Sequence, residues 1–366
     1  TREDGDSITV SVPTYRIDVS RPCDVAEEIL RIYGYNNVEI PQHVRASLNH
    51  TAKPDNEQMV NAAANLLSSQ GFNEIMCLSL TNAKRYDGLL SYPQEKLVRL
   101  QNPNSAELNA MRQTLLFGGL EAIAYNINRR QSDLKLYELG NVYYKQSPTG
   151  SVTERFGEEA RLGIFITGAL HKKSWNEAQS SSNFFALKKY VELLLQRFGV
   201  SLHTLQEEAL PADIFSDGAA YKLAGKSFLS MGIVRKKLRD MFDVKQDVYF
   251  AEIRWQPLLS FAARQKTTYT ELPKYPEVTR DLALLLDKNI TFAQLREAAH
   301  RTEKKLLQSV RLFDVYDGDK LPEGKKSYAL SFTLQDSDRT LTEQDIERIM
   351  GNLVKAFEKD FGAQLR

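Results

Sequence analysis

The sequence is poor in cysteine, which restricts both its chemistry and its compartment. Its 366 residues include two cysteines, Cys23 and Cys77, which lie far apart and outside any C-x-x-C pair. This spacing argues against a disulfide framework and against a thiolate metal site, and it is typical of a protein from a reducing compartment. We therefore expect a cytoplasmic protein.

Long apolar runs and targeting signals are also missing. Every apolar run is shorter than the roughly 20 residues that a membrane-spanning helix needs, so the sequence predicts no membrane span. The chain opens on Thr-Arg-Glu-Asp-Gly-Asp-Ser, with neither an initiator methionine nor a signal-peptide pattern. We interpret the sequence as a piece of a longer protein whose preceding part completes the first domain.

Net charge is almost absent, and so are several catalytic patterns. The 48 Lys and Arg residues are balanced by 47 Asp and Glu residues, so no bulk attraction draws the chain to nucleic acid or membrane. Any contact with nucleic acid must come from local patches.

Several catalytic and phosphate-binding motifs are also missing. No glycine-rich phosphate loop is present, which argues against P-loop and dinucleotide-binding folds. The histidines are scattered and predict no hydrolase triad: His43, His50, His171, His203 and His300.

Length and composition predict a globular protein of more than one domain. Hydrophobic residues make up 42% of the chain and charged residues 26%, as in soluble globular proteins. A chain of 366 residues is too long for one compact core, so two or three domains are expected. Helical and strand patterns occur without regular alternation, which indicates the α+β class.

Four carboxylates stand close together near the start of the chain: Asp18, Asp24, Glu27 and Glu28. If residues 25–33 are helical, the last three share one face of the helix, and Asp18 lies within reach just upstream. Oxygen ligands that converge on one point would bind a hard cation such as Mg2+. The structural alternative is a capping box, with Asp24 at the N-cap and Glu27 at N3. The residues alone favour the capping box and leave the metal site open.

The stretch 44–270 indicates a mixed sheet with helices laid against it. Helical spacing of apolar residues occurs near 59–71, 115–129 and 184–198, and strand patterns lie between these helices, one of them over 72–80. The second helix is a candidate surface for packing against a partner, although a core within the chain explains its apolar face equally well: Leu116, Leu120, Ile123 and Ile127. Its pair Gly118-Gly119 favours close packing of the backbone.

The cleanest pattern begins after a polar, proline-containing linker at 267–276. It predicts a ferredoxin-like domain in the order strand, helix, strand, strand, helix, strand. The expected elements are, in chain order: 279–287, 291–301, 310–316, 326–334, 342–361 and 364–366. Such a sheet has one face covered by two helices and one open face.

Strings along the whole chain resemble one family. The run from Asp24 to Asn36, preceded by Pro13 to Asp18, resembles the end of the B5 domain of phenylalanyl-tRNA synthetase beta subunits. Further strings resemble the catalytic-like module and the anticodon-binding domain of the same family: Asn102-Pro103, Met111-Arg112 with Leu115-Leu116, Leu136 to Gly140, Tyr275-Pro276, Arg280 to Ala283, Phe313 to Tyr316, Gly324 to Ser327, Arg339 to Thr342 and Leu365-Arg366.

The resemblance implies that the chain has three parts with separate functions. It implies the C-terminal part of B5 at 1–43, a non-catalytic class II synthetase-like module at 44–270 and a ferredoxin-like anticodon-binding domain at 274–366. It further implies a Mg2+ ion held by Asp18, Asp24, Glu27 and Glu28 at the contact with the alpha subunit, within an assembly of two alpha and two beta chains. ATP would be used by the whole enzyme and not bound by this chain, which has no Gly-x-Gly-x-x-Arg string.

The same resemblance implies that the last domain binds tRNA(Phe). Residues 275–366 hold 15 Lys and Arg against 16 Asp and Glu, so 15 − 16 = −1 and the usual basic footprint of RNA binding is missing. Binding would then depend on a few placed cations and on aromatic platforms for bases. The candidates are Arg280, Phe313, Tyr316, Lys325, Lys326 and Arg339.

Two functions follow from these observations. In the first, the chain is part of a phenylalanine–tRNA ligase that supplies a subunit contact, a shared Mg2+ site and anticodon binding, while the alpha subunit catalyses the reaction. In the second, the chain is a free-standing RNA-binding or scaffolding protein with a ferredoxin-like domain.

Overall fold

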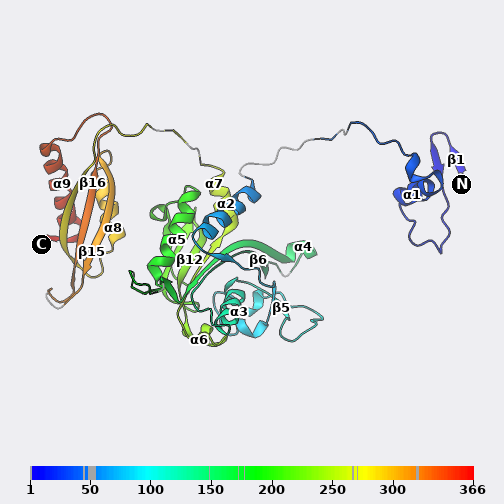
Figure 1. Cartoon of the computed structure of the whole chain (residues 1–366), viewed down its shortest axis with the longest axis horizontal. Coiled ribbons are helices and arrows are strands. Elements are labelled where there is room, and N and C mark those ends of the chain that lie inside the picture. Colours follow the sequence, from blue (N-terminus) through cyan, green and yellow to red (C-terminus); the bar gives the residue numbers. More distant parts are fainter. Residues whose placement is uncertain are drawn as a thin grey trace. The chain divides into compact units, whose positions relative to one another are not determined.

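The computed structural model describes residues 2–43, 46–47, 55–147, 149–171, 173–176, 178–265, 268–269, 271–318 and 321–366 (Figure 1). The chain divides into two compact units, Thr1–Ala52 and Lys53–Arg366. Residue 44, at the predicted first boundary, lies outside the described residues, as do 267 and 270 in the predicted linker. Within the described part of the chain, no helix is long and apolar enough to cross a bilayer.

The first unit contains a short hairpin and one helix. Strand β1 (Arg2–Asp4) pairs antiparallel with β2 (Ser7–Thr9), and α1 (Pro22–Tyr33) is followed by the 3-10 turn η1 (Tyr35–Asn37). Gly34 ends α1 with a φ of 95°, a conformation that glycine adopts without a steric cost. None of the residues of α1 is buried.

The start of α1 corrects the predicted cap. The helix begins at Pro22, with Arg21 as the N-cap residue, so Asp24 occupies N3 and Glu27 lies beyond the cap. The reason is that proline at the first helical position has its φ already set and needs no N–H partner. Asp24 still caps the helix, because its side chain accepts a hydrogen bond from the backbone N–H of Arg21 at 2.8 Å.

The second unit begins with a region from α2 to α7 that we call the middle module. Its elements are, in chain order: α2 (Asn56–Ser69), β3 (Asn73–Glu74), β4 (Leu80–Thr81), η2 (Ala83–Tyr86), η3 (Gln94–Lys96), β5 (Ala110–Met111), α3 (Leu116–Ile127), β6 (Leu134–Lys145), α4 (Val152–Arg155), β7 (Phe156–Thr167), β8 (Ala169–His171), β9 (Ser180–Ser181), α5 (Phe184–Arg197), η4 (Leu202–Thr204), β10 (Gln206–Glu208), β11 (Phe215–Leu223), β12 (Lys226–Val234), α6 (Lys236–Asp240), β13 (Val248–Arg254) and α7 (Trp255–Ala262).

A seven-stranded sheet forms the centre of the middle module. Its strand order is β10-β11-β12-β13-β7-β6-β3, and all neighbours are antiparallel except the short parallel pair β3 and β6. Because side chains alternate along a strand, the residues of β7 pack into two cores, one on each face of the sheet. Leu162, Ile164 and Ile166 pack with α2, α5 and α7, whereas Phe165 packs on the other face with α3.

Helix α3 uses its apolar side inside its own core. Leu116, Leu120 and Ile123 are fully buried there, so the predicted partner-packing helix is corrected in favour of the alternative given with it. The predicted close packing at Gly118-Gly119 is confirmed. A Cβ atom on Gly119 would lie 2.1 Å from Cζ of Phe165.

The predicted long strand at 72–80 is instead two short strands separated by an irregular segment. After β3, the backbone N–H of Cys77 is bonded to the Glu138 carboxylate at 3.3 Å rather than to a backbone carbonyl of β6. The chain therefore leaves the sheet ladder early. Helix α7 was not predicted, because Pro257 lies in it, yet proline is tolerated in the first turn of a helix.

The last region, from β14 to β17, is here called the C-terminal module. It consists of β14 (Val278–Asp287), α8 (Phe292–Thr302), β15 (Leu307–Tyr316), β16 (Lys325–Leu334), α9 (Glu343–Phe361) and β17 (Gln364–Leu365). The antiparallel sheet has the order β15-β16-β14-β17, which is ferredoxin-like as predicted. Capping boxes at Thr291 and Thr342 fix the starts of both helices.

Candidate functional site

The acidic cluster of the first unit is organised around arginines. Nη2 of Arg16 donates hydrogen bonds to Oδ2 of Asp18 at 2.9 Å and to Oε1 of Glu28 at 2.8 Å, so one guanidinium joins the loop to α1. Arg31 donates two further bonds to Glu28, each at 3.0 Å. Asp18 and Glu28, two of the four predicted metal ligands, thus lie close together with the guanidinium of Arg16 between them.

The other two carboxylates, Asp24 and Glu27, differ in their surroundings. Asp24 accepts bonds from the guanidinium of Arg21 and from the backbone N–H groups of Arg21 and Ser20, and these bonds hold its pKa well below the usual range. Glu27 is exposed on the surface of α1. Hydrogen bonds from Arg16 lower the pKa of Asp18 and of Glu28.

The donor chemistry of this cluster therefore fits a hard cation, since three of the carboxyls are ionised well below neutral pH. Their arrangement is different from a ligand shell. Among the described residues, no group of three or more His, Cys, Asp or Glu side chains is arranged to hold a metal ion. A cation at this place would have to displace the guanidinium of Arg16.

Two of the strings noted in the sequence meet in the interior of the middle module. Arg112 donates a hydrogen bond to Glu138 at 2.6 Å, with both side chains almost fully buried. Arg112 also donates to the carbonyl of Asn141 at 2.8 Å. A Cβ atom on Gly140 would lie 2.3 Å from Nη2 of Arg112, so only glycine fits there. These residues form a buried structural ion pair.

A small cavity of about 240 Å³ lies on the sheet of the middle module, where Arg161, Arg254, Glu252 and Tyr92 are among the lining residues. Glu252 is buried and accepts a hydrogen bond from Arg161 at 2.6 Å and one from the hydroxyl of Tyr92 at 3.1 Å. Arg254 is bonded to Glu159 through two of its nitrogens, and Arg161 donates to Glu159 as well. Both arginines are therefore paired with carboxylates.

The electrostatics of the cavity follow from these pairs. Burial alone would lower the pKa of Arg161, but the charge of Glu252 outweighs it and the pKa is raised. Burial raises the pKa of the Tyr92 hydroxyl, and the nearby Glu252 raises it further. Glu252 also accepts bonds from the hydroxyl of Thr114 and the backbone N–H of Leu115, at 2.8 and 2.9 Å. The carboxylate is fully engaged in holding the loop before α3.

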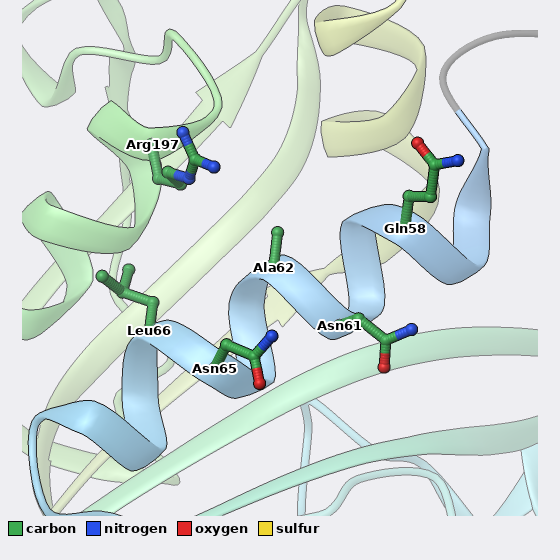
Figure 2. Close-up of a pocket in the computed structure, with 6 residues that line it drawn as sticks. All are labelled: Gln58, Asn61, Ala62, Asn65, Leu66 and Arg197. Atoms are coloured by element: carbon green, nitrogen blue, oxygen red, sulfur yellow. The ribbon is translucent and has the colours of Figure 1, made fainter.

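The outward side of α2 carries a shallow groove of about 490 Å³. Five lining residues come from α2 and the sixth, Arg197, from the end of α5 (Figure 2). Three of the α2 residues carry carboxamides: Gln58, Asn61 and Asn65. The opposite side of the helix is buried in the core through Met59, Ala63 and Leu67. The groove thus combines carboxamide groups and one guanidinium with the apolar side chains of Ala62 and Leu66.

The sheet of the C-terminal module has two chemically different faces. Leu330, Phe332 and Leu334 of β16 point into the core with the helices, so the residues between them point to the other, open face. Strand register then places Ser327 between Leu285 of β14 and Tyr316 of β15 on that face. In the other rows of this face, Ala329 lies between Ala283 and Asp314, Ser331 between Asp281 and Arg311, and Lys325 opposite Asp287.

The predicted tRNA-binding residues are divided between the two faces. Tyr316 and Lys325 lie on the open face, where Lys325 is paired with Asp287 at 2.7 Å. Phe313 is exposed at an irregularity in the register of β15. The helix-covered side holds Arg280, which pairs with Glu343 at 3.0 Å, and Lys326, whose Nζ donates to the hydroxyl of Tyr328 at 2.9 Å.

Arg339 lies before α9 rather than on the sheet. A hydrogen bond from the hydroxyl of Thr342 lowers the pKa of Asp345, and the guanidinium of Arg339, 2.9 Å from that carboxyl, lowers it further. Four of the six candidates thus have a partner that neutralises or engages their polar group.

Two cations of the open face were missed in the sequence. Arg311 alternates with Val310 and Leu312, which pack on the core, and this period of two could have identified its orientation. Arg366 was noted only as part of a family string. Its guanidinium carbon lies 5.4 Å from the centre of the Tyr316 ring. Neither arginine has an ion pair within the described residues.

Three family models match the chain. The model "Phenylalanyl tRNA synthetase beta chain CLM domain" matches residues 40–255, and "Ferredoxin-fold anticodon binding domain" matches residues 273–366. The model "tRNA synthetase B5 domain" matches residues 1–35. The three matches occur in the order that the sequence predicts.

Curated relatives agree with these matches. Phenylalanine--tRNA ligase beta subunits from Bacteroides fragilis and Porphyromonas gingivalis are 48% and 43% identical to the chain over its full length. The chain spans 45% of the length of each. Among solved structures, a pyrrolysyl tRNA synthetase from Desulfitobacterium hafniense is similar at 14% identity and a TM-score of 0.41, over 56% of this chain and 67% of that one.

Proposed function

The chain belongs to the phenylalanyl-tRNA synthetase beta-chain family. We therefore propose that it is the part of a phenylalanine–tRNA ligase that contacts the alpha subunit and binds tRNA(Phe), without catalysing the reaction itself. The whole enzyme would join phenylalanine to tRNA(Phe) with ATP and Mg2+, in the cytoplasm and as an assembly of two alpha and two beta chains. The alpha subunit would carry the chemistry. The relatives from Bacteroides fragilis and Porphyromonas gingivalis, both beta subunits of this ligase, do not favour a free-standing scaffold.

The observation that carries this proposal is the pairing of arginines on the central sheet. A synthetase that activates an amino acid needs arginines that face the phosphates of ATP, because negative charge develops there. In the middle module, Arg161 and Arg254 are bonded to Glu252 and Glu159 instead. A cavity of about 240 Å³ is also below the usual range for a ligand site. Both facts support a module that does not bind ATP, as expected for a non-catalytic copy of a class II synthetase fold.

We divide the chain functionally at the boundaries 1–43, 44–270 and 274–366. The matches of the three family models to 1–35, 40–255 and 273–366 support this division. The first part would share a Mg2+ ion with the alpha subunit, the second would pack against that subunit, and the third would bind the anticodon.

We propose that the C-terminal module binds tRNA(Phe) through its open sheet face and the cations near it. The sites are Tyr316 and Lys325 on that face, Phe313 on the edge strand, Arg280 and Lys326 on the helix-covered side of the sheet, and Arg339 before α9. Aromatic rings and cations are the groups that bind unpaired bases and phosphates. The match of this region to an anticodon-binding family supports the proposal.

Binding of tRNA by this module should depend on salt. We expect that Lys326→Ala and Arg339→Ala each weaken binding of a tRNA(Phe) transcript to the chain, with a salt slope smaller by roughly 0.7–0.9 for each phosphate that the variant no longer neutralises. Filter binding at several salt concentrations measures both quantities. Lys236→Ala, which removes an exposed cation of α6, serves as control. Unchanged affinity in both variants would remove these two residues from the site.

We propose further that Asp18, Asp24, Glu27 and Glu28 hold a Mg2+ ion once the alpha subunit is bound. The support is their chemistry, since the pKa of three of them is lowered and oxygen ligands suit this ion. Arg16 lies where it competes with such an ion for Asp18 and Glu28. The ion would supply a bridge between subunits.

Removal of Arg16 separates the metal site from the structural alternative. If the carboxylates bind metal, Arg16→Met should raise the affinity of the complex with the alpha subunit for Mg2+ several-fold, because the competing guanidinium is gone. Asp18→Asn should lower it, and Asp6→Asn, in the same unit but outside the cluster, should change nothing. Titration calorimetry measures these affinities. A weaker α1 with no Mg2+ binding in Arg16→Met would establish the purely structural role.

A further inference from the structure

A second cavity of the central sheet region, of about 470 Å³, lies between the turn that joins β11 to β12 and one side of α7. We propose that this α7 cavity binds a small organic anion that carries an apolar body. Its volume is within the usual range for a small-molecule site. The inference is independent of the proposed tRNA binding, because the lining residues fall between Glu159 and Arg264, outside the C-terminal module.

One wall of the α7 cavity is a single side of the helix. A spacing of four residues brings Gln256, Ser260 and, just after the helix end, Arg264 to this side. The half-buried ring of Phe261 lines the cavity beside them. Leu258, on the other side of α7, is fully buried in the core. The helix therefore presents hydrogen-bonding groups and a positive charge next to an apolar surface.

The other wall is a tight turn with an unusual backbone. Leu223 and Lys226 are paired in register, so the turn consists of Ala224 and Gly225. Both have a positive φ, 51° and 77°, as in the type I′ hairpin turn, which favours asparagine, aspartate or glycine at its first position. A non-glycine residue held in this conformation is strained, and such residues concentrate at ligand sites. The short side chain of Ala224 lines the cavity and leaves its space to a ligand.

The charges of the α7 cavity are mainly positive. Glu159 is the one carboxylate among the described lining residues, and it accepts hydrogen bonds from both Arg254 and Arg161. Lys226 and Arg264 are exposed, and neither has an ion pair within the part of the chain that the structure describes. Two cations of the lining thus keep their full charge, which attracts an anionic ligand.

The apolar part of the lining distinguishes an organic anion from an inorganic one. Leu223 is buried, and Pro257 and Phe261 are half-buried at the cavity. An inorganic ion would leave this surface in contact with water, whereas an aromatic or aliphatic body would cover it. A ligand with one charged end and one apolar end therefore matches both halves of the lining.

A fluorescent aromatic phosphate tests the α7 cavity. The probe is 1-naphthyl phosphate, whose fluorescence anisotropy rises when it binds to the full chain. We expect Lys226→Gln and Arg264→Gln each to weaken binding roughly 5-fold, the upper end for an exposed ion pair. Neutral 1-naphthol should bind more weakly than the probe, because it lacks the charge. Inorganic phosphate should displace the probe only at much higher concentration, because it lacks the apolar body.

The matched control is Lys237→Gln, because Lys237 of α6 is also exposed but does not line the α7 cavity. It should bind the probe like the unchanged chain. Unchanged binding in both Lys226→Gln and Arg264→Gln, or no binding of millimolar probe to the unchanged chain, would refute the site. Binding of 1-naphthol as tight as that of the probe, or displacement by an equal concentration of inorganic phosphate, would also overturn the proposal. None of these outcomes bears on tRNA binding, which is measured separately.

Discussion

Arg112→Leu should lower the free energy of unfolding of the middle module by about 3–5 kcal/mol, the usual cost of leaving one partner of a buried ion pair alone. Arg112 and Glu138 are each almost fully buried, and their atoms lie 2.6 Å apart. Removal of the guanidinium also leaves the carbonyl of Asn141 without this donor. Urea unfolding followed by tryptophan fluorescence measures the effect, because both tryptophans lie in this module and Trp255 is buried.

An exposed ion pair in the same module provides the control. Lys236→Gln breaks the pair of Lys236 with Asp240, in which both side chains are at least half exposed, so we expect a change below about 1 kcal/mol. The double variant Arg112→Leu with Glu138→Leu should recover part of the stability, since no buried charge remains. An effect of Arg112→Leu as small as that of Lys236→Gln would contradict the structural role assigned to the pair.

Gly119→Ala should destabilise the middle module by about 1–3 kcal/mol, even though alanine is the better helix former. The added methyl group would lie 2.1 to 2.7 Å from three carbons of the Phe165 ring. That ring cannot withdraw easily, because it is fully buried and stacked on Phe250 with ring centres 4.6 Å apart. Native-state hydrogen exchange of the α3 amides measures the effect.

Gly351→Ala is the matched control, because Gly351 also lies inside a helix, α9, but faces open space. There the same substitution should stabilise by about 0.5–1 kcal/mol through helix propensity alone. The two variants thus carry the same chemical change with opposite expected signs. Destabilisation of both, or of neither, would contradict the account of close packing between α3 and the sheet.

The C-terminal module could be predicted from its sequence almost element by element. Apolar residues alternate along β16, capping boxes mark Thr291 and Thr342, and Gly362 ends α9 in the left-handed conformation. These signals are local, so they can be recognised in the sequence without knowledge of the tertiary structure. Helix α7 and the early end of β3 were missed, because they depend on a tolerated proline and on one hydrogen bond from a distant carboxylate.

Partners of the charged residues could not be predicted, because they are set by strands and helices far apart in the chain. Nothing near Arg280 in the sequence indicates that it pairs with Glu343, 63 residues away. Likewise, spacing placed four carboxylates together but did not show that Arg16 lies between Asp18 and Glu28. The metal site and the individual tRNA contacts therefore stay predictions from family resemblance.

We propose that this chain positions the tRNA and the alpha subunit, while the alpha subunit performs the chemistry. ATP–pyrophosphate exchange with phenylalanine measures this most directly, with the purified chain alone and after co-expression with an alpha subunit. We expect no exchange by the chain alone, because Arg161 and Arg254 are paired with glutamates, and we expect exchange by the joint complex. Phenylalanine-dependent exchange by the chain alone, abolished in Arg161→Gln, would contradict the claim.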